Sequence, residues 1–183
     1  MIKFVGSFET VASLPRTMFP EYAFIGRSNV GKSSLINAIV GQAVARTSNT
    51  PGRTQSINMF NLDDRVMIVD LPGYGYARAS RTDTVRWLRR LEEYLMTRHL
   101  ARLYILVDSR IGARPSDIEL MEFCDAHGVA YQVVLTKKDK RVRELVQHEL
   151  SHENHPAMIA EILETSAEKK TGLEPIRAQI GIK

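Results

Sequence analysis

The sequence predicts an α/β fold with a doubly wound, mostly parallel six-stranded sheet that contains one antiparallel strand and forms the middle of three α/β/α layers. Short apolar runs of strand length alternate with segments in which apolar residues recur at helical spacing. A glycine-rich segment, Gly26 to Ser33, joins one such run to one such segment. Short motifs follow two later runs directly, at the strand ends where open α/β sheets bind ligands. These observations predict a ligand site at one edge of the sheet.

Composition indicates an ordinary globular chain. The 183 residues are 44% apolar and 25% charged, which suits one domain over residues 1–183 with residues 1–20 as an N-terminal lead-in. No run approaches the roughly 20 apolar residues of a membrane span and no signal-peptide pattern opens the chain, so we expect a cytoplasmic protein that does not bind a membrane. The single cysteine, Cys124, excludes an internal disulfide and is expected in the core. The net charge of +4 permits a polyanionic partner without requiring one.

The sheet strands are expected where apolar or alternating runs end at turn residues. The run before Gly26 supplies a central strand. An alternating run, a polar turn and a fully apolar run then form a hairpin that ends at Asp70. A short strand at residues 2–8 precedes them within the lead-in. The six sheet strands are placed at residues 20–25, 56–62, 66–69, 103–107, 129–135 and 159–164.

Helices are expected at residues 34–40, 82–100, 116–127, 141–152 and 172–180. Gly41 and Gly128 suit the left-handed residue that closes the first and third of these helices. Ser116 and Glu119 form a capping box that opens the third. Pro175 stands near the start of the last helix, where its missing N–H matters least.

The segment from Gly26 to Ser33 fits the phosphate-binding pattern of Gly, four variable residues, Gly, Lys and Ser or Thr. Its glycines let the backbone approach a phosphate, so that successive N–H groups and the N-terminus of the following helix point at negative charge. Lys32 would reach the β and γ phosphates, and the Ser33 hydroxyl would ligate Mg²⁺. A turn that binds nothing is the weaker alternative, because a lysine at the tip of a tight loop has no packing role. The predicted nucleotide-binding residues here are Gly26, Arg27, Ser28, Asn29, Val30, Gly31, Lys32 and Ser33.

Asp70, Leu71, Pro72 and Gly73 form the Asp-x-x-Gly pattern that follows the second nucleotide strand in Mg²⁺-dependent P-loop proteins. The Asp70 carboxylate can hold a water of the Mg²⁺ shell, and the Gly73 N–H can meet a γ-phosphate and lose it after hydrolysis. The pattern alone is common in turns, but behind a phosphate-binding loop it is a strong signal. The polar stretch 42–55, which lacks periodicity, is interpreted as a switch loop.

The tetrad after the strand at residues 129–135 comprises Thr136, Lys137, Lys138 and Asp139. A buried carboxylate at Asp139 can accept hydrogen bonds from guanine N1–H and the 2-amino group, whereas adenine presents an acceptor at N1. GTP is therefore favoured over ATP by a margin on the order of several kcal/mol. Lys137 would lay its stem along the base while its ammonium reaches the phosphate-binding loop. A final triad at the same edge comprises Thr165, Ser166 and Ala167, and the N–H groups of its last two residues would bind the guanine carbonyl.

Arginines are concentrated around the helix at residues 82–100, where seven arginines stand against three acidic residues between positions 78 and 102. A solvated helix face and an RNA-contacting surface are equally good interpretations of this excess. The candidate RNA contacts are Arg78, Arg81, Arg86, Arg89 and Arg90. The sequence also brings three histidines close together, which we interpret as solvated surface residues rather than a metal site: His148, His152 and His155.

Five motifs in series resemble the EngB family of bacterial GTPases, also called YihA or YsxC. They read G-R-S-N-V-G-K-S, T-P-G-R-T-Q, D-L-P-G-Y-G-Y-A, T-K-K-D and T-S-A, in that order along nearly the whole chain. The segment D-S-R-I-G-A-R-P-S-D also resembles the family's stretch after the next strand. The resemblance implies a P-loop GTPase fold, GTP hydrolysis, and a role in maturation of the large ribosomal subunit that is needed for normal cell division and growth. We expect a monomer whose partners are GTP or GDP and the rRNA and proteins of that subunit.

The same resemblance implies that Thr54 is the switch-loop Mg²⁺ ligand and that Asp70 to Gly73 sense the γ-phosphate. Catalytic roles would fall to Lys32, Thr54 and Gly73. Thr136 stands where many GTPases have Asn, and its shorter hydroxyl would tether the phosphate-binding loop less firmly. The switch-loop residues that would cover the nucleotide are Gly52, Arg53, Thr54, Gln55 and Ser56.

Tyr74 occupies the position where Ras-like proteins carry the glutamine that orients the attacking water. A phenol cannot copy the donor and acceptor of an amide, and no internal arginine finger is identifiable, so intrinsic hydrolysis is expected to be slow. We hypothesise completion in trans by ribosomal RNA or protein, or by K⁺ held near Asn29, the position of the K⁺-ligating Asn in related GTPases. Two alternatives remain open: a P-loop ATPase or phosphotransferase, which Asp139 argues against, and a GTPase that serves tRNA modification, another RNA or ion transport.

Overall fold

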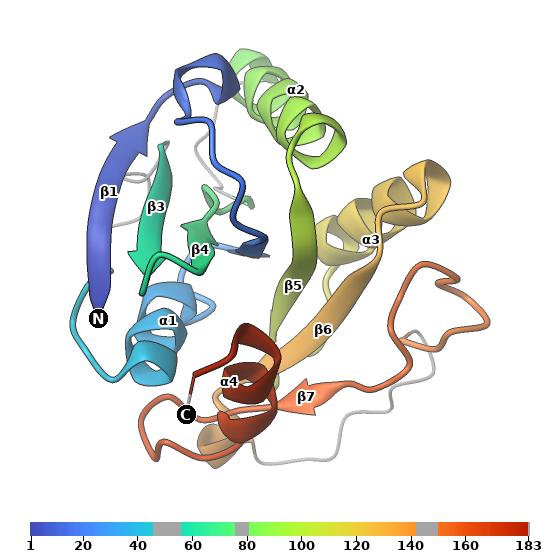
Figure 1. The fold of residues 1–183 in the computed structure, drawn as a ribbon. Coiled ribbons are helices and arrows are strands. Elements are labelled where there is room, and N and C mark those ends of the chain that lie inside the picture. The colour runs from blue at the N-terminus through green and yellow to red at the C-terminus, as the bar shows by residue number, and fades with distance from the viewer. Residues whose placement is uncertain (46–55, 76–80, 142–149, 183) are drawn as a thin grey trace.

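The computed structural model describes residues 1–45, 56–75, 81–141 and 150–182, with only the backbone described for residues 81–84 (Figure 1). Its strands are β1 (Ile2–Phe8), β2 (Glu21–Gly26), β3 (Ile57–Leu62), β4 (Val66–Asp70), β5 (Leu100–Asp108), β6 (Tyr131–Thr136) and β7 (Leu163–Glu164). They form one sheet in the order β1-β3-β4-β2-β5-β6-β7. β3 runs antiparallel to both of its neighbours, and the other pairs are parallel. The α/β class with one antiparallel strand is thereby confirmed.

The sheet has seven strands rather than the six predicted, because the strand in the lead-in joins it. β1 pairs with β3 along its whole length, apart from an irregularity between Phe4 and Gly6. Without β1, the outer edge of β3 would present a row of unpaired N–H and C=O groups. At the opposite edge β7 is shorter than the predicted run 159–164, because pairing with β6 is interrupted between an isolated bridge at Met158 and the start of β7.

Helices cover both faces of the sheet (Figure 1). One core contains buried side chains of α2 (Arg81–Thr97) and α3 (Pro115–His127), and the other contains those of α1 (Lys32–Val40) and α4 (Glu174–Ile180). Successive residues of β5 alternate between the two cores. Leu103 and Ile105 belong to the first, whereas Tyr104 and Leu106 belong to the second. This arrangement confirms the three α/β/α layers.

Two helix ends lie where the glycines predict. Gly41 closes α1 with φ 70°, and Gly128 closes α3 with φ 65°, both in the left-handed region. Most of the helix predicted at residues 141–152 falls on residues 142–149, which are outside the described residues.

The start of α3 differs from the prediction. Arg114 is the N-cap residue and Pro115 opens the helix, so the predicted box of Ser116 and Glu119 is wrong. The Arg114 N–H donates to Asp117 Oδ2 at 2.7 Å. Proline prefers the first helical turn, where its fixed φ suits the helix, and it therefore sets this start.

Cys124 was expected in the core and His155 at the surface, and only the first expectation is confirmed. Cys124 is fully buried, as predicted, but His155 is not a solvated residue. It is 4% exposed, and its Nδ1 lies 2.7 Å from Asp125 Oδ2, because the end of α3 supplies a partner for the buried ring. His152 is exposed, and His148 lies outside the described residues. Within the described ranges, no three His, Cys, Asp or Glu side chains are grouped to hold a metal ion, and no helix has the length and apolar character to cross a bilayer.

Candidate nucleotide-binding site

The phosphate-binding loop joins the end of β2 to the start of α1. The backbone turns sharply here, with left-handed conformations at Asn29 (φ 63°) and Gly31 (φ 102°). A Cβ on Gly26 would lie 2.9 Å from Leu106 O, so a side chain at this position would push the loop away from β5. Ser33 is half-buried in the first turn of α1. The loop therefore leads into the start of α1, where the first N–H groups of the helix can donate hydrogen bonds to a phosphate.

An ion pair connects the loop to β4. Lys32 Nζ donates to Asp70 Oδ1, and the two side chains are 10% and 4% exposed. Asn58 Nδ2 lies 3.4 Å from the second carboxylate oxygen of Asp70. A buried polar group needs a partner, and here Lys32 and Asp70 are each other's partner at the start of α1.

The Asp-x-x-Gly segment lies directly against the phosphate-binding loop. Tyr74 N–H donates to Gly26 O at 3.3 Å, and Ser28 N–H donates to Tyr74 O at 3.0 Å. A Cβ on Gly73 would lie 3.0 Å from Gly26 O. This pairing continues the parallel alignment of β2 and β4 beyond the sheet and keeps the Gly73 backbone beside the loop.

The Tyr74 side chain is directed into the core toward α3. It is 6% exposed, its hydroxyl donates to Asp117 Oδ1 at 2.6 Å, and its ring centroid lies 5.6 Å from that of Trp87. Burial, followed by the Asp117 carboxylate, raises the pKa of Tyr74 well above its ordinary value. The side chain that replaces the Ras-like glutamine is thus a neutral phenol engaged with another helix.

Residues at the end of β6 bind the loop from the other side. Thr136 is buried, and its hydroxyl donates to Val30 O at 2.7 Å. Lys137 has a left-handed backbone (φ 57°), and its Nζ donates to Asn29 O at 2.7 Å. The tether expected to be weak at Thr136 is therefore present. Together the two side chains fix the backbone at the middle of the loop.

In the two segments expected to bind guanine, the Asp139 carboxylate is exposed and the Ser166 N–H already has a hydrogen-bond partner. Asp139 is exposed, so the expectation of a buried carboxylate is wrong for the protein alone, and a hydrogen bond from the Ser166 hydroxyl lowers its pKa. Ser166 N–H donates to Thr171 O at 3.0 Å, which corrects the expectation that it is available to a guanine carbonyl. The Ala167 N–H has no hydrogen-bond partner within the described ranges and is left for that contact. Lys138 N–H donates to Thr165 O at 3.0 Å and thereby joins the two segments.

Asp108, at the end of β5, is a site residue that the sequence reasoning did not assign. Its Oδ2 accepts from Lys137 Nζ at 2.8 Å and from Arg110 Nη2 at 2.7 Å. Burial opposes ionisation, but the hydrogen bonds from Arg110 and Lys137 prevail and lower the pKa of Asp108 to about 2. A carboxylate directly after a strand that lies between two nucleotide-binding strands was the available signal, since such strand ends meet at one edge.

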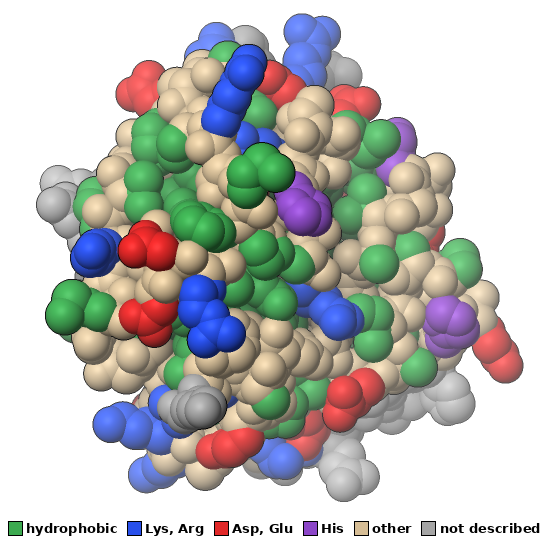
Figure 2. Space-filling model, in the orientation of Figure 1, with side chains coloured by type: hydrophobic (Ala, Val, Ile, Leu, Met, Phe, Trp, Pro, Cys, Tyr) green, Lys and Arg blue, Asp and Glu red, His purple; other side chains and the backbone are tan. Residues whose placement is uncertain are grey.

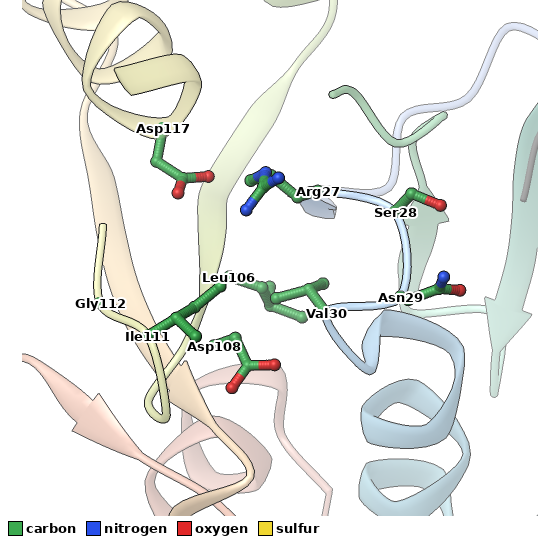
Figure 3. A pocket seen from close by; sticks show the side chains of 9 residues that line it. All are labelled: Arg27, Ser28, Asn29, Val30, Leu106, Asp108, Ile111, Gly112 and Asp117. Carbon is green, nitrogen blue, oxygen red and sulfur yellow. The ribbon is translucent and has the colours of Figure 1, made fainter. Parts of the chain in front are cut away.

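A small cavity of about 40 Å³ lies beside the phosphate-binding loop (Figure 3). Loop residues 27–30 line one side, and residues of β5 and of the segment before α3 line the other. Arg27 from the loop and Asp117 from α3 face each other there (Figure 3). Arg27 Nε is buried and has no hydrogen-bond partner among the residues that the structure describes. Asp117 is the second residue that the sequence reasoning left without a role.

Several predicted residues cannot be placed. The switch-loop residues outside the described ranges are Gly52, Arg53, Thr54 and Gln55, while Ser56 is half-buried just before β3. Of the candidate RNA contacts, Arg86 and Arg89 are exposed on α2 and Arg90 is half-buried, but Arg78 and the side chain of Arg81 are not described. Figure 2 shows a face on which basic, acidic and apolar side chains are interspersed.

The fold has close counterparts among solved structures. A crystal structure of a probable GTP-binding protein EngB superposes with a TM-score of 0.69 at 24% identity and covers 88% of this chain and 96% of its own. Era of Aquifex aeolicus bound to GDP·AlF4⁻ superposes with a TM-score of 0.68 at 25% identity and covers 90% of this chain and 56% of its own. These likenesses establish the P-loop GTPase fold.

Sequence relatives establish the family. Residues 21–137 match the family model described as 50S ribosome-binding GTPase. The probable GTP-binding protein EngB of Cereibacter sphaeroides is 46% identical over 181 residues, which cover 95% of this chain and 83% of the relative. The protein of the same description from Bartonella bacilliformis is 44% identical over 193 residues, which cover 97% of this chain and 90% of the relative. The chain therefore belongs to the EngB family of GTP-binding proteins and is a GTPase.

Proposed function

We propose that this GTPase is a Mg²⁺-dependent switch in the assembly of the large ribosomal subunit, needed for normal cell division and growth. Residues 1–183 would act as a single cytoplasmic domain and as a monomer. The observation that carries the switch is the backbone pairing of Tyr74 with the phosphate-binding loop, because it keeps the Gly73 N–H beside the loop that holds the phosphates. The ribosomal role is supported by the matching family's description as a 50S ribosome-binding GTPase.

The donor set suits Mg²⁺. The Ser33 hydroxyl stands in the first turn of α1, and the Asp70 carboxylate reaches the same turn through its ion pair with Lys32. Ser33 and Asp70 would offer hard oxygen atoms to the ion, Asp70 by way of a water, and Thr54 would complete the set from the switch loop. Bound Mg²⁺ would neutralise charge on the β and γ phosphates, and Lys32 would turn from Asp70 toward the same oxygens. We assign catalytic roles to Lys32, Thr54 and Gly73.

Guanine recognition follows from the β6 edge. Asp139 would accept from guanine N1–H and the 2-amino group, and Ala167 N–H would donate to the carbonyl oxygen. The Lys137 stem would lie along the base, since its ammonium is held by Asn29 O and Asp108 on the loop side. A bound base would cover the exposed Asp139 carboxylate and exclude water from its hydrogen bonds.

Hydrolysis would be slow without help. The Tyr74 hydroxyl is engaged with Asp117, so it cannot orient a water in this conformation. We propose activation in trans by ribosomal RNA or protein, or by K⁺ bound at Asn29. Replacing K⁺ with Na⁺ distinguishes ribosomal activation from activation by K⁺. If turnover is unchanged by the exchange, both with and without ribosomal particles, the K⁺ proposal is contradicted.

The ribosomal role is tested by co-sedimentation with purified subunits in a non-hydrolysable GTP analogue and in GDP, each at two salt concentrations. We expect binding to the large subunit that requires the GTP analogue and weakens steeply with salt. Equal or absent binding in both states would contradict the assembly role. Preferential binding to the small subunit would instead favour another RNA partner, of the kind seen in the structure of Era with part of 16S ribosomal RNA.

The α2 surface is tested in the same assay. Arg86 and Arg89 are exposed, so their joint replacement by alanine should leave folding unchanged. Binding should weaken, and the slope of log affinity against log salt concentration should fall by about one to two, one for each lost phosphate contact. A matched control replaces Glu92 and Glu93, exposed acidic residues of the same helix. Binding that is insensitive to the arginine pair would favour a solvated helix face.

A further inference from the structure

Tyr74 connects three parts of the molecule through a single residue. Its backbone N–H and C=O pair with Gly26 and Ser28 of the phosphate-binding loop, at 3.3 and 3.0 Å. Its side chain crosses to α3 and donates to Asp117 Oδ1 at 2.6 Å. The residue next to Gly73 is therefore held from both sides, by the loop through its backbone and by α3 through its hydroxyl.

Asp117 is a fixed acceptor for this bond. It is 1% exposed, and its second oxygen accepts from the Arg114 N–H at 2.7 Å, which orients the carboxylate at the start of α3. A carboxylate in the first turn of a helix is also favoured by the helix dipole. The acceptor is thus set by α3 itself and does not depend on the Asp-x-x-Gly segment.

The neighbouring contacts leave little freedom around Tyr74. Trp87 Nε1 donates to Pro72 O at 3.1 Å on one side of the segment. On the other side, a Cβ on Gly75 would lie 3.1 Å from Arg27 Nε and 3.8 Å from Ser116 Oγ. Gly75 has φ 76°, so this close fit between the loop and α3 depends on a residue without a side chain. Among the residues that the structure describes, the Tyr74–Asp117 bond is the side-chain hydrogen bond that holds the segment to α3.

We propose that Asp117 is a positioning residue of the switch: through the Tyr74 hydroxyl it holds Gly73 beside the phosphate-binding loop and thereby favours GTP over GDP. Because Gly73 meets only the γ-phosphate, loss of the bond should weaken GTP-state binding and leave GDP binding unchanged. This inference rests on the proposed contact between the Gly73 N–H and the γ-phosphate. That contact is tested separately by Gly73→Ala, since the added Cβ would lie 3.0 Å from Gly26 O.

The test compares two buried tyrosines of the same chemistry. Tyr94, on α2, is fully buried and donates to Glu21 Oε2 at 2.6 Å. Glu21 begins β2, so this bond lies at the opposite end of the strand from the phosphate-binding loop. Tyr74→Phe, Asp117→Ala and Tyr94→Phe are titrated with fluorescent GDP and a fluorescent non-hydrolysable GTP analogue. Thermal unfolding reports the stability of each variant.

We expect Tyr74→Phe and Asp117→Ala each to lower the ratio of GTP-analogue to GDP affinity by about tenfold, the scale of one hydrogen bond to a charged group. The double variant should be no worse than the single variants, because all three lose the same bond. Tyr94→Phe should lose stability with its ratio unchanged. An unchanged ratio in Tyr74→Phe, or an equal change in Tyr94→Phe, would overturn the inference. If Gly73→Ala keeps the wild-type ratio, the proposed γ-phosphate contact itself is wrong.

Discussion

On the guanine side of the site, side chains at the carboxyl end of β6 and just after it bind the backbone of the phosphate-binding loop, whereas on the γ-phosphate side the backbone of Tyr74 binds the loop. The guanine side is held by the Thr136 hydroxyl and the Lys137 ammonium, both at 2.7 Å from loop carbonyls. The γ-phosphate side is held by two backbone hydrogen bonds and by the side chain of Asp117. The first set of contacts is independent of the third phosphate, and the second lies next to the residue that would sense it.

This difference predicts that one side of the site sets the affinity for both guanine nucleotides and the other sets the preference between GTP and GDP. Contacts on the guanine side should contribute equally to GTP and GDP, because both nucleotides present the same base and the same β-phosphate. Contacts on the γ-phosphate side should change the ratio between them. Variants on the guanine side should therefore change both affinities together, in contrast to variants of Tyr74, which should change their ratio.

The largest effect is expected from Asp139→Asn. An amide can accept from guanine N1–H, but its NH₂ group then faces the 2-amino donor, and two donors repel each other. We expect GTP and GDP affinity to fall by about 100-fold, while xanthosine nucleotides, which carry a carbonyl at that position, bind more tightly than guanosine nucleotides.

Competition between unlabelled nucleotides and fluorescent GDP measures this change. The control is Asp64→Asn, an exposed aspartate in the turn after β3. Retention of GTP affinity within threefold in Asp139→Asn would contradict the assignment of Asp139 to the base.

An intermediate effect is expected from Thr136→Val. The substitution keeps the shape of the side chain but removes the donor to Val30 O, and an unsatisfied buried carbonyl costs about 1 kcal/mol. Affinity for GDP and for a GTP analogue should fall about fivefold together, with their ratio unchanged. Thr97→Val is a matched control, because the Thr97 hydroxyl also donates to a backbone carbonyl, that of Glu93, but on α2. A changed ratio in Thr136→Val would remove the distinction between the two sides.

The sequence predicted the elements that carry this site because local patterns determine them. A loop between an apolar run and an amphipathic segment, with Gly26 and Gly31 at its ends, needs no distant contact to be recognised. The same holds for the glycines that close α1 and α3. The capping box predicted at Ser116 and Glu119 was wrong, because Pro115 sets the start of α3 one residue earlier.

Distant contacts explain what the sequence did not predict. Tyr74 and Asp117 are 43 positions apart, and nothing in either neighbourhood indicates that the hydroxyl meets the carboxylate. His155 looked like a surface residue until Asp125, 30 positions away, supplied a buried partner. Ser166 N–H is occupied by a turn that closes at Thr171. Pairings of this kind depend on how the layers pack, which periodicity does not specify.

The smallest effect on nucleotide binding is expected from Asp108→Asn, which removes a partner of Lys137 without touching the nucleotide. Affinity should fall no more than about threefold, equally for GDP and the GTP analogue, since Lys137 keeps its bond to Asn29 O. Stability should respond more strongly, because hydrogen bonds from Arg110 and Lys137 outweigh burial and lower the pKa of Asp108 from 3.8 to about 2.

The sign of the pH dependence follows from that lowered pKa. A carboxyl group whose pKa is lower in the folded state stabilises the fold above its unfolded pKa, and this stabilisation is lost as the pH falls through the folded pKa. The free energy of unfolding of the wild type should therefore exceed that of Asp108→Asn by about 1 kcal/mol at pH 6, since solvent screens the partly exposed Arg110 partner, and the difference should shrink between pH 4 and pH 2. Urea denaturation at successive pH values measures it. A difference that is constant with pH would show that the Asp108 charge does not hold Lys137, and the guanine side would then depend on Thr136 and Asn29 O alone.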